Sequence, residues 1–121
     1  MGTIRRFEEL EAWKNSRRVA CAIYDLTASG AFAKDFGLMD QIRRAAIGGM
    51  SNIAEGFDSR TDRGFIQFLG IARASLGEVK SQLYLALDRD YVDQQEFDSV
   101  YELCDKTSRQ ISKLINYLRT E

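Results

Sequence analysis

The sequence predicts an all-α protein, an antiparallel up-down-up-down four-helix bundle formed by residues 1–121 as a single domain. Its 121 residues, 45% of them hydrophobic, are enough to enclose one core. The chain has no proline, a residue that interrupts helices because it lacks an N–H. Apolar side chains also recur every three or four residues in four segments, whereas no strand-like alternation of useful length is present. Helices joined by loops of a few residues must fold back on one another.

The first two expected helices cover about residues 7–29 and 36–57. Gly30 follows the first as a C′ residue would, and Asp35 precedes the second as an N-cap. Their apolar stripes are Leu10, Trp13, Ala20, Ile23, Tyr24 and Leu26 in the first, and Ile42, Ala46, Gly49, Ile53 and Phe57 in the second.

The other two expected helices cover about residues 61–89 and 94–119. The fourth opens at Asp93, with Glu96 three residues later as an acidic variant of the capping box. Their apolar stripes are Phe65, Leu69, Ala72, Leu76, Val79, Leu83 and Leu87 in the third, and Phe97, Val100, Cys104, Ile111, Leu114, Ile115 and Leu118 in the fourth.

Charge and composition exclude several classes of function. The net charge is −1, and neither half of the chain has a large positive excess. Histidine is absent, which removes the commonest general base and metal ligand, so we expect neither metal nor cofactor. No apolar run approaches a membrane span, so we expect no membrane partner and a cytoplasmic protein. Cys21 and Cys104 fall at similar heights on the first and fourth helices, and we expect two small buried thiols.

Small residues crowd the second and third helices. Glycines inside a helix each cost about 1 kcal/mol relative to alanine, so the close approach of another helix is expected to offset them. The small residues are Ala45, Ala46, Gly48, Gly49, Ser51, Ala54 and Gly56 in the second helix, and Gly70, Ala72, Ala74, Ser75 and Gly77 in the third. Tight helix packing is the favoured interpretation, and a groove for a ligand or partner is the alternative.

Polar residues share one face of each of these two helices. They are Gln41, Arg44, Asn52 and Glu55 in the second helix, and Ser75, Glu78 and Gln82 in the third. A turn near residues 59–60 places Arg44 level with Ser75, so a charge-assisted hydrogen bond between Arg44 and Glu78 is within reach. We expect this network to fix helix register or a subunit contact. Catalysis is disfavoured, since Glu55 and Glu78 are expected to lie several turns apart.

Three stretches resemble a bacterial four-helix-bundle family first described as ribosomal-RNA intervening-sequence proteins. They are residues 37–46 (GLMDQIRRAA), 52–56 (NIAEG) and 65–78 (FIQFLGIARASLGE), and the resemblance covers nearly the whole chain. It implies an up-down four-helix subunit that assembles into a ring, typically a homopentamer. Relatives include the accessory variability protein of retroelements that generate diversity, which is associated with RNA and a reverse transcriptase.

Two hypotheses for function follow. The first is a non-catalytic interaction module that self-assembles into a ring. The alternative is an accessory protein that binds RNA through a basic patch on the first two helices. That patch comprises Arg5, Arg6, Lys14, Arg17, Arg18, Arg43 and Arg44, among which Glu8, Glu9 and Glu11 are interspersed. A mixed charged face is most often merely solvated. An enzyme is least favoured, because Cys104 has no histidine to act as its base.

Overall fold

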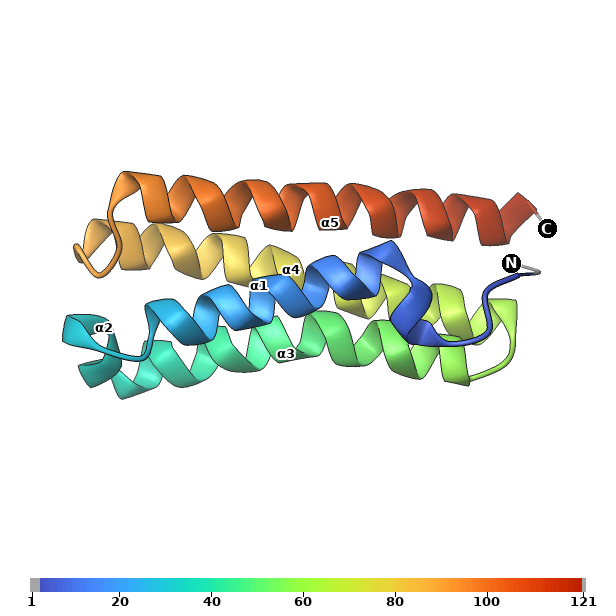
Figure 1. Cartoon of the computed structure of the whole chain (residues 1–121), viewed down its shortest axis with the longest axis horizontal. Helices are drawn as coiled ribbons and strands as arrows, with labels where there is room; N and C mark the ends of the chain where they lie inside the picture. Colours follow the sequence, from blue (N-terminus) through green and yellow to red (C-terminus); the bar gives the residue numbers. More distant parts are fainter. Residues whose placement is uncertain (1–2, 121) are drawn as a thin grey trace.

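The computed structural model describes residues 3–120 and confirms an all-α bundle, in which four long helices run antiparallel to their neighbours (Figure 1). The elements are a 3₁₀ turn η1 (Phe7–Glu9), α1 (Glu11–Leu26), a short α2 (Gly30–Lys34), α3 (Phe36–Asp58), α4 (Asp62–Asp88) and α5 (Gln94–Thr120). The ends of α3, α4 and α5 differ from the expected boundaries by one residue at most.

One apolar core runs along the bundle. Helix α1 packs against α3 and α5, and α4 packs against the same two helices from the other side. Fully buried aliphatic side chains come from every long helix: Val19, Ile23, Ile42, Ile53, Leu69, Leu76, Val79, Leu83 and Ile111. Burial of each such side chain contributes roughly 1.5–3 kcal/mol relative to leaving it exposed. The predicted stripes therefore form the core, although Tyr24 is exposed and five stripe residues are half-buried: Trp13, Leu26, Phe57, Leu87 and Leu114.

The expected first helix over residues 7–29 was wrong at both ends. Leu10 has an extended backbone and separates η1 from α1. Its side chain is buried, and the rings of Phe7 and Trp13 meet edge to face with centroids 5.1 Å apart. At the other end α1 stops at Leu26, and the hydroxyl of Thr27 donates to the carbonyl of Ile23 at 2.7 Å. The apolar spacing continued through the break at Leu10 and hid it, whereas at the other end the stripe itself ends at Leu26, where α1 ends.

Gly30 begins the short helix α2 rather than ending α1. Its φ of +70° lies in the left-handed region, which glycine adopts without strain, and this reverses the chain direction. The reversal buries Phe32, whose ring stacks on Tyr91 with centroids 5.2 Å apart. The Tyr91 hydroxyl donates to Asp35 at 2.9 Å, so α2 closes one end of the bundle.

Side-chain caps fix where the other long helices begin. Asp35 accepts a hydrogen bond from the Leu38 N–H at 3.1 Å, as predicted. Thr61 caps α4 in the same way through the Gly64 N–H. The capping box at α5 is also confirmed: Asp93 accepts from the Glu96 N–H at 2.7 Å, and Glu96 accepts from the Asp93 N–H at 2.9 Å.

Candidate functional site

The register between α3 and α4 differs from the expected one by one helical turn. A Cβ placed on Gly48 would lie 2.9 Å from the Ser75 hydroxyl, so Ser75 faces Gly48 and not Arg44. The expected Arg44–Glu78 hydrogen bond was therefore wrong. Arg44 instead donates to Asp40 on its own helix at 2.9 Å, and its side chain is exposed. The turn near residues 59–60 does not by itself set the register in which the two helices pack.

The seven residues of the predicted polar network do not bond to one another within the described chain. Gln41, Arg44, Glu55 and Glu78 are exposed, whereas Asn52, Ser75 and Gln82 are half-buried. Asn52 donates to the carbonyl of Gly48 at 2.8 Å, which is a contact within α3. The amide oxygen of Gln82 is buried without a partner among residues 3–120. The predicted role of this face in a subunit contact stays a prediction.

The glycines of the two helices fall into two groups. In α3 a Cβ on Gly49 would lie 3.1 Å from Leu76, and one on Gly56 would lie 2.8 Å from Phe68. Close packing on α4 thus explains these positions, as expected. In α4 the expected close approach of another helix of the chain was wrong for Gly70 and Gly77, since a Cβ on either would meet nothing within 4 Å among the described residues.

The outward face of α4 is poor in charge over residues 70–85. Spacings of three and four residues place one row of small side chains there, and Glu78 is the one charged residue between Arg73 and Lys80. Exposed apolar side chains accompany the row: Ile71 is 45% exposed and Leu85 is 49% exposed. We name this surface the α4 face, defined by Gly70, Ile71, Ala74, Gly77, Ser81 and Leu85.

A second group of exposed apolar side chains lies elsewhere on the bundle. Phe36 is 72% exposed and Ile47 is 40% exposed, and both belong to α3. Tyr24 on α1 is 41% exposed, and the Arg43 guanidinium of α3 lies 4.2 Å from its ring centroid. We name this surface the α1–α3 face, defined by Tyr24, Phe36 and Ile47.

The predicted basic patch does not form one continuous surface. Arg5 and Arg6 lie near Lys14 around an open hollow, whose lining also includes Glu8 and Glu9. Arg6 pairs with Glu8 at 2.8 Å, which raises the pKa of Arg6 and lowers the pKa of Glu8. This end of the patch is therefore a mixed charged surface.

The two arginines of α3, Arg43 and Arg44, bind partners within the chain and do not extend the basic patch. Besides its contact with Tyr24, Arg43 donates from Nε to the Thr27 hydroxyl at 2.8 Å, so it joins α3 to the end of α1. Arg44 pairs with Asp40. Both side chains make contacts within the chain.

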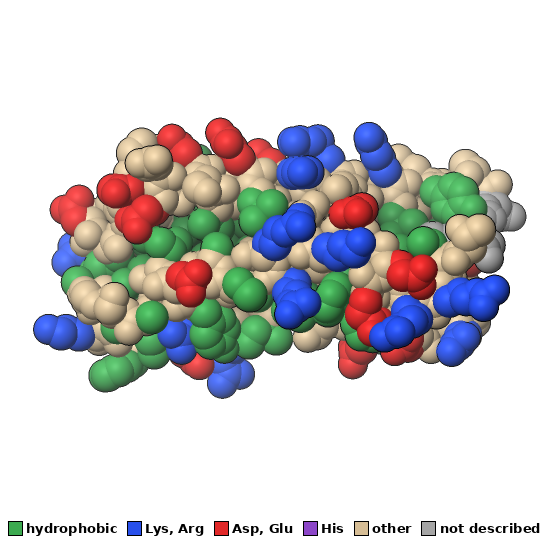
Figure 2. Space-filling model, viewed as in Figure 1, with side chains coloured by type: hydrophobic (Ala, Val, Ile, Leu, Met, Phe, Trp, Pro, Cys, Tyr) green, Lys and Arg blue, Asp and Glu red, His purple; other side chains and the backbone are tan. Residues whose placement is uncertain are grey.

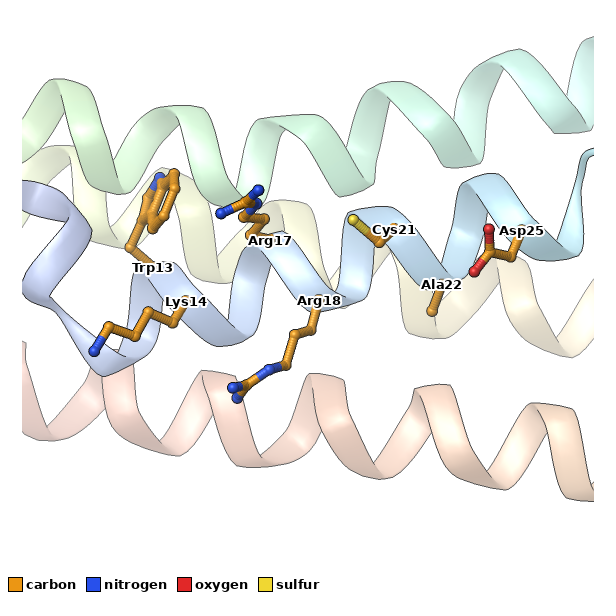
Figure 3. A pocket seen from close by; sticks show the side chains of 7 residues that line it. All are labelled: Trp13, Lys14, Arg17, Arg18, Cys21, Ala22 and Asp25. Atoms are coloured by element: carbon orange, nitrogen blue, oxygen red, sulfur yellow. The ribbon is translucent and has the colours of Figure 1, made fainter.

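The remaining cations of α1 point in two directions (Figure 3). The guanidinium of Arg17 lies 5.8 Å from the Trp13 ring centroid, on the side of α3. Arg18 extends toward α5 and donates to the Asn15 side-chain oxygen at 2.6 Å. Asn15 is 2% exposed and donates in turn to Gln110 of α5 at 2.8 Å. A shallow hollow of about 470 Å³ lies along this stretch of α1.

Sequence reasoning missed the cations that α5 adds. Lys106, Arg109 and Lys113 are exposed, and none forms an ion pair within residues 3–120. Figure 2 shows basic side chains gathered over the middle of the face formed by α1 and α5, with acidic side chains toward its left end and others mixed with basic ones toward the right. The sequence does indicate this basic surface, since residues 106–120 contain four basic residues and no Asp or Glu.

The two cysteines differ from expectation in one respect. Cys104 is buried as predicted, and burial raises the pKa of its thiol to about 12. Cys21 is exposed, so the expectation of a second buried thiol was wrong. Beside Cys104, Lys80 donates to Asp105 at 2.5 Å, and this hydrogen bond raises the pKa of Lys80. The Lys80 ammonium also lies 4.8 Å from the Tyr101 ring centroid.

Within the described residues, no three His, Cys, Asp or Glu side chains lie close enough together to hold a metal ion. None of the described helices combines the length and apolar character that crossing a membrane requires.

Comparison with known proteins places the chain in a family. The sequence pattern of the 23S rRNA-intervening sequence protein family matches residues 8–113, whereas no curated protein matches. A crystal structure from Bacteroides thetaiotaomicron VPI-5482, of a protein with unknown function from the S23 ribosomal protein family, has a similar fold. The TM-score is 0.80 at 21% identity, over 87% of this chain and 95% of that one. The chain belongs to the 23S rRNA-intervening sequence protein family.

Proposed function

We propose that this protein is a non-catalytic, cytoplasmic interaction module whose subunits assemble into a closed ring. The observation that supports this most is the α4 face. Gly70 and Gly77 each lower helix stability by about 1 kcal/mol relative to alanine, and no described neighbour explains them. Close approach of a helix from another subunit would explain both glycines and would cover Ile71 and Leu85.

The position of the second apolar surface supports a ring over a two-fold dimer. The α1–α3 face involves the two helices α1 and α3, whereas the α4 face lies on α4 alone. If the α4 face of one subunit covers the α1–α3 face of the next, each contact joins two different surfaces. Such contacts repeat from subunit to subunit and close into a ring when the rotation permits. Five subunits is the number that the resemblance implies.

Composition supports the other parts of the proposal. The chain has no histidine, so the residue most often used as a general base is missing. Both cysteines are free, as is usual for proteins of a reducing cytoplasm.

The test is the molar mass in solution, measured by light scattering after size-exclusion chromatography. We expect the parent protein to elute as an oligomer and Gly77→Arg to elute as a monomer with the same helical circular dichroism. Asn116→Arg adds the same charge at an exposed position of α5 and should leave the oligomer intact. A parent mass of one subunit, or equal effects of the two variants, would contradict the proposal.

A further inference from the structure

Basic residues of α1 and α5 converge on the seam between these two helices. Residues 12–24 and 106–120 contain three and four basic residues, respectively, and no acidic one. All eighteen acidic residues therefore lie elsewhere, with the other ten basic ones. A chain with a net charge of −1 thus carries one strongly positive region, which the overall charge conceals.

The Asn15–Gln110 hydrogen bond shows which residues of the two helices are level. Lys106 and Lys113 lie four residues before and three residues after Gln110, so they share its side of α5. Arg18 lies three residues after Asn15, on the side of α1 that faces α5. Lys14 lies four residues before Arg18, on the same side of α1. Lys14, Arg18, Lys106 and Lys113 therefore border the seam. Arg109 lies beside them on α5, and Arg17 lies toward the α3 side of α1. We name this surface the α1–α5 band, defined by Lys14, Arg17, Arg18, Lys106, Arg109 and Lys113.

Arg18 is held in place by the buried part of the seam. Asn15 accepts one hydrogen bond from its guanidinium and is itself anchored on Gln110. A guanidinium has five N–H donors, and Asn15 uses one of those of Arg18, so the remaining donors can bind a ligand. Most other cations of the band are also free of ion pairs with described residues. Lys14, which pairs with Glu11 at 3.6 Å, is the one member with an ion pair among the described residues.

We infer that the α1–α5 band binds the phosphate backbone of a nucleic acid duplex. The band presents cations along two neighbouring helices, α1 and α5, and the polar side chains of Asn15 and Gln110 lie between them. This arrangement matches a row of phosphates, which bind basic side chains without regard to sequence.

An anionic membrane is the weaker match for this surface. Helices that bind membranes place Trp, Phe and Leu side chains next to their cations. Among the described residues, the exposed Phe, Ile and Leu side chains lie on α3 and α4, whereas the large exposed apolar side chains of α1 and α5 are Tyr24 and Tyr117. The α1–α5 band therefore lacks an aliphatic anchor.

The test is fluorescence anisotropy of labelled RNA and DNA duplexes of about 20 base pairs, titrated with the full chain at about 50–200 mM salt. We expect binding that weakens steeply with salt. Arg18→Gln with Lys106→Gln and Lys113→Gln should weaken binding more than about tenfold and reduce the salt slope by about three. Equal binding of both duplexes indicates recognition of the backbone alone, and a preference for RNA indicates that its shape or 2′-hydroxyls contribute.

A control variant distinguishes binding by the α1–α5 band from a general effect of the positive charge of the chain. Arg44→Gln with Arg63→Gln and Arg89→Gln removes three exposed cations elsewhere and should leave the affinity within about twofold. If the Arg18 variant loses helical circular dichroism, Lys106→Gln with Lys113→Gln gives the same test with a slope change of about two, because neither lysine forms an ion pair within residues 3–120.

Three results would overturn the inference. The first is no binding by the parent at the lowest salt concentration, and the second is an equal loss in the control triple variant. The third is sedimentation with anionic phospholipid vesicles in the absence of duplex binding. Arg18 lies on the α5 side of α1, and the two lysines lie on α5, so the substitutions are away from both the α4 face and the α1–α3 face. The molar mass from light scattering therefore reports separately on ring assembly.

Discussion

The side-chain amide of Asn15 donates a 2.8 Å hydrogen bond to the side-chain oxygen of Gln110, and this bond joins α1 to α5 inside the bundle. Asn15 is 2% exposed, so its amide depends on this partner and on Arg18. Asn15→Ala should lower the free energy of unfolding by about 1–3 kcal/mol, because Gln110 and Arg18 lose their shared partner. Urea denaturation measures this change, and Asn116→Ala at an exposed position of α5 is the control. Equal free energies of unfolding for the two variants would show that the Asn15–Gln110 hydrogen bond does not stabilise the bundle.

Two glycines of α3 should respond to alanine in opposite directions. At Gly56 the new methyl group would lie 2.8 Å from Phe68 and 2.9 Å from Phe65, so one of the helices must shift. We expect a loss of about 1–3 kcal/mol from this overpacking. At Gly37, where the nearest atom is 3.8 Å away, alanine should add up to about 1 kcal/mol. Thermal unfolding of both variants checks the pair, and a neutral Gly56→Ala would mean that α3 and α4 pack less closely than described.

The capping box of α5 offers a local test. Asp93→Ala removes the acceptor of the Glu96 N–H and should cost about 1 kcal/mol. Glu96→Ala should cost less, because the exposed Asp93 N–H that it leaves can bond to water. Chemical denaturation ranks the two variants. The reverse ranking would assign the larger role to Glu96.

Cys104 makes stability depend on pH at the alkaline end. Burial raises the pKa of its thiol to about 12 in the folded chain, whereas the unfolded thiol ionises near its ordinary pKa. The folded state therefore holds more protons, and its stability falls as pH rises from about 9 toward 12, by up to about 1.4 kcal/mol per pH unit. Cys104→Ala should flatten this decline in denaturation curves measured from about pH 8 to 10.5. An unchanged slope would indicate that the thiol already reaches water in the folded state.

The fold was predictable because its signals are local and repeated. The stripe from Phe65 to Leu83 sets one face of α4, and Asp35 and Asp93 mark helix starts through caps that involve only their own turns. The breaks in the first expected helix were not predictable in the same way. The reversal at Gly30 depends on burial of Phe32 against Tyr91, a contact between residues far apart in the chain.

The candidate surfaces were predictable only in part, since they depend on which helices are neighbours. The α1 cations were identified from the sequence, but their partners on α5 depend on the pairing of Asn15 with Gln110 across 95 residues. The arginines of α3 show the opposite error. Arg43 is taken up by Tyr24 and Thr27, contacts that no spacing along α3 indicates.

Ring assembly is the central claim, and sedimentation equilibrium of the full chain tests it most directly. The proposed contact joins two different surfaces, so it can either close or extend without limit. We expect one species with a fixed whole-number multiple of 13.8 kDa that does not grow as the protein concentration rises. A single subunit at every concentration, or a mass that increases continuously, would contradict a closed ring.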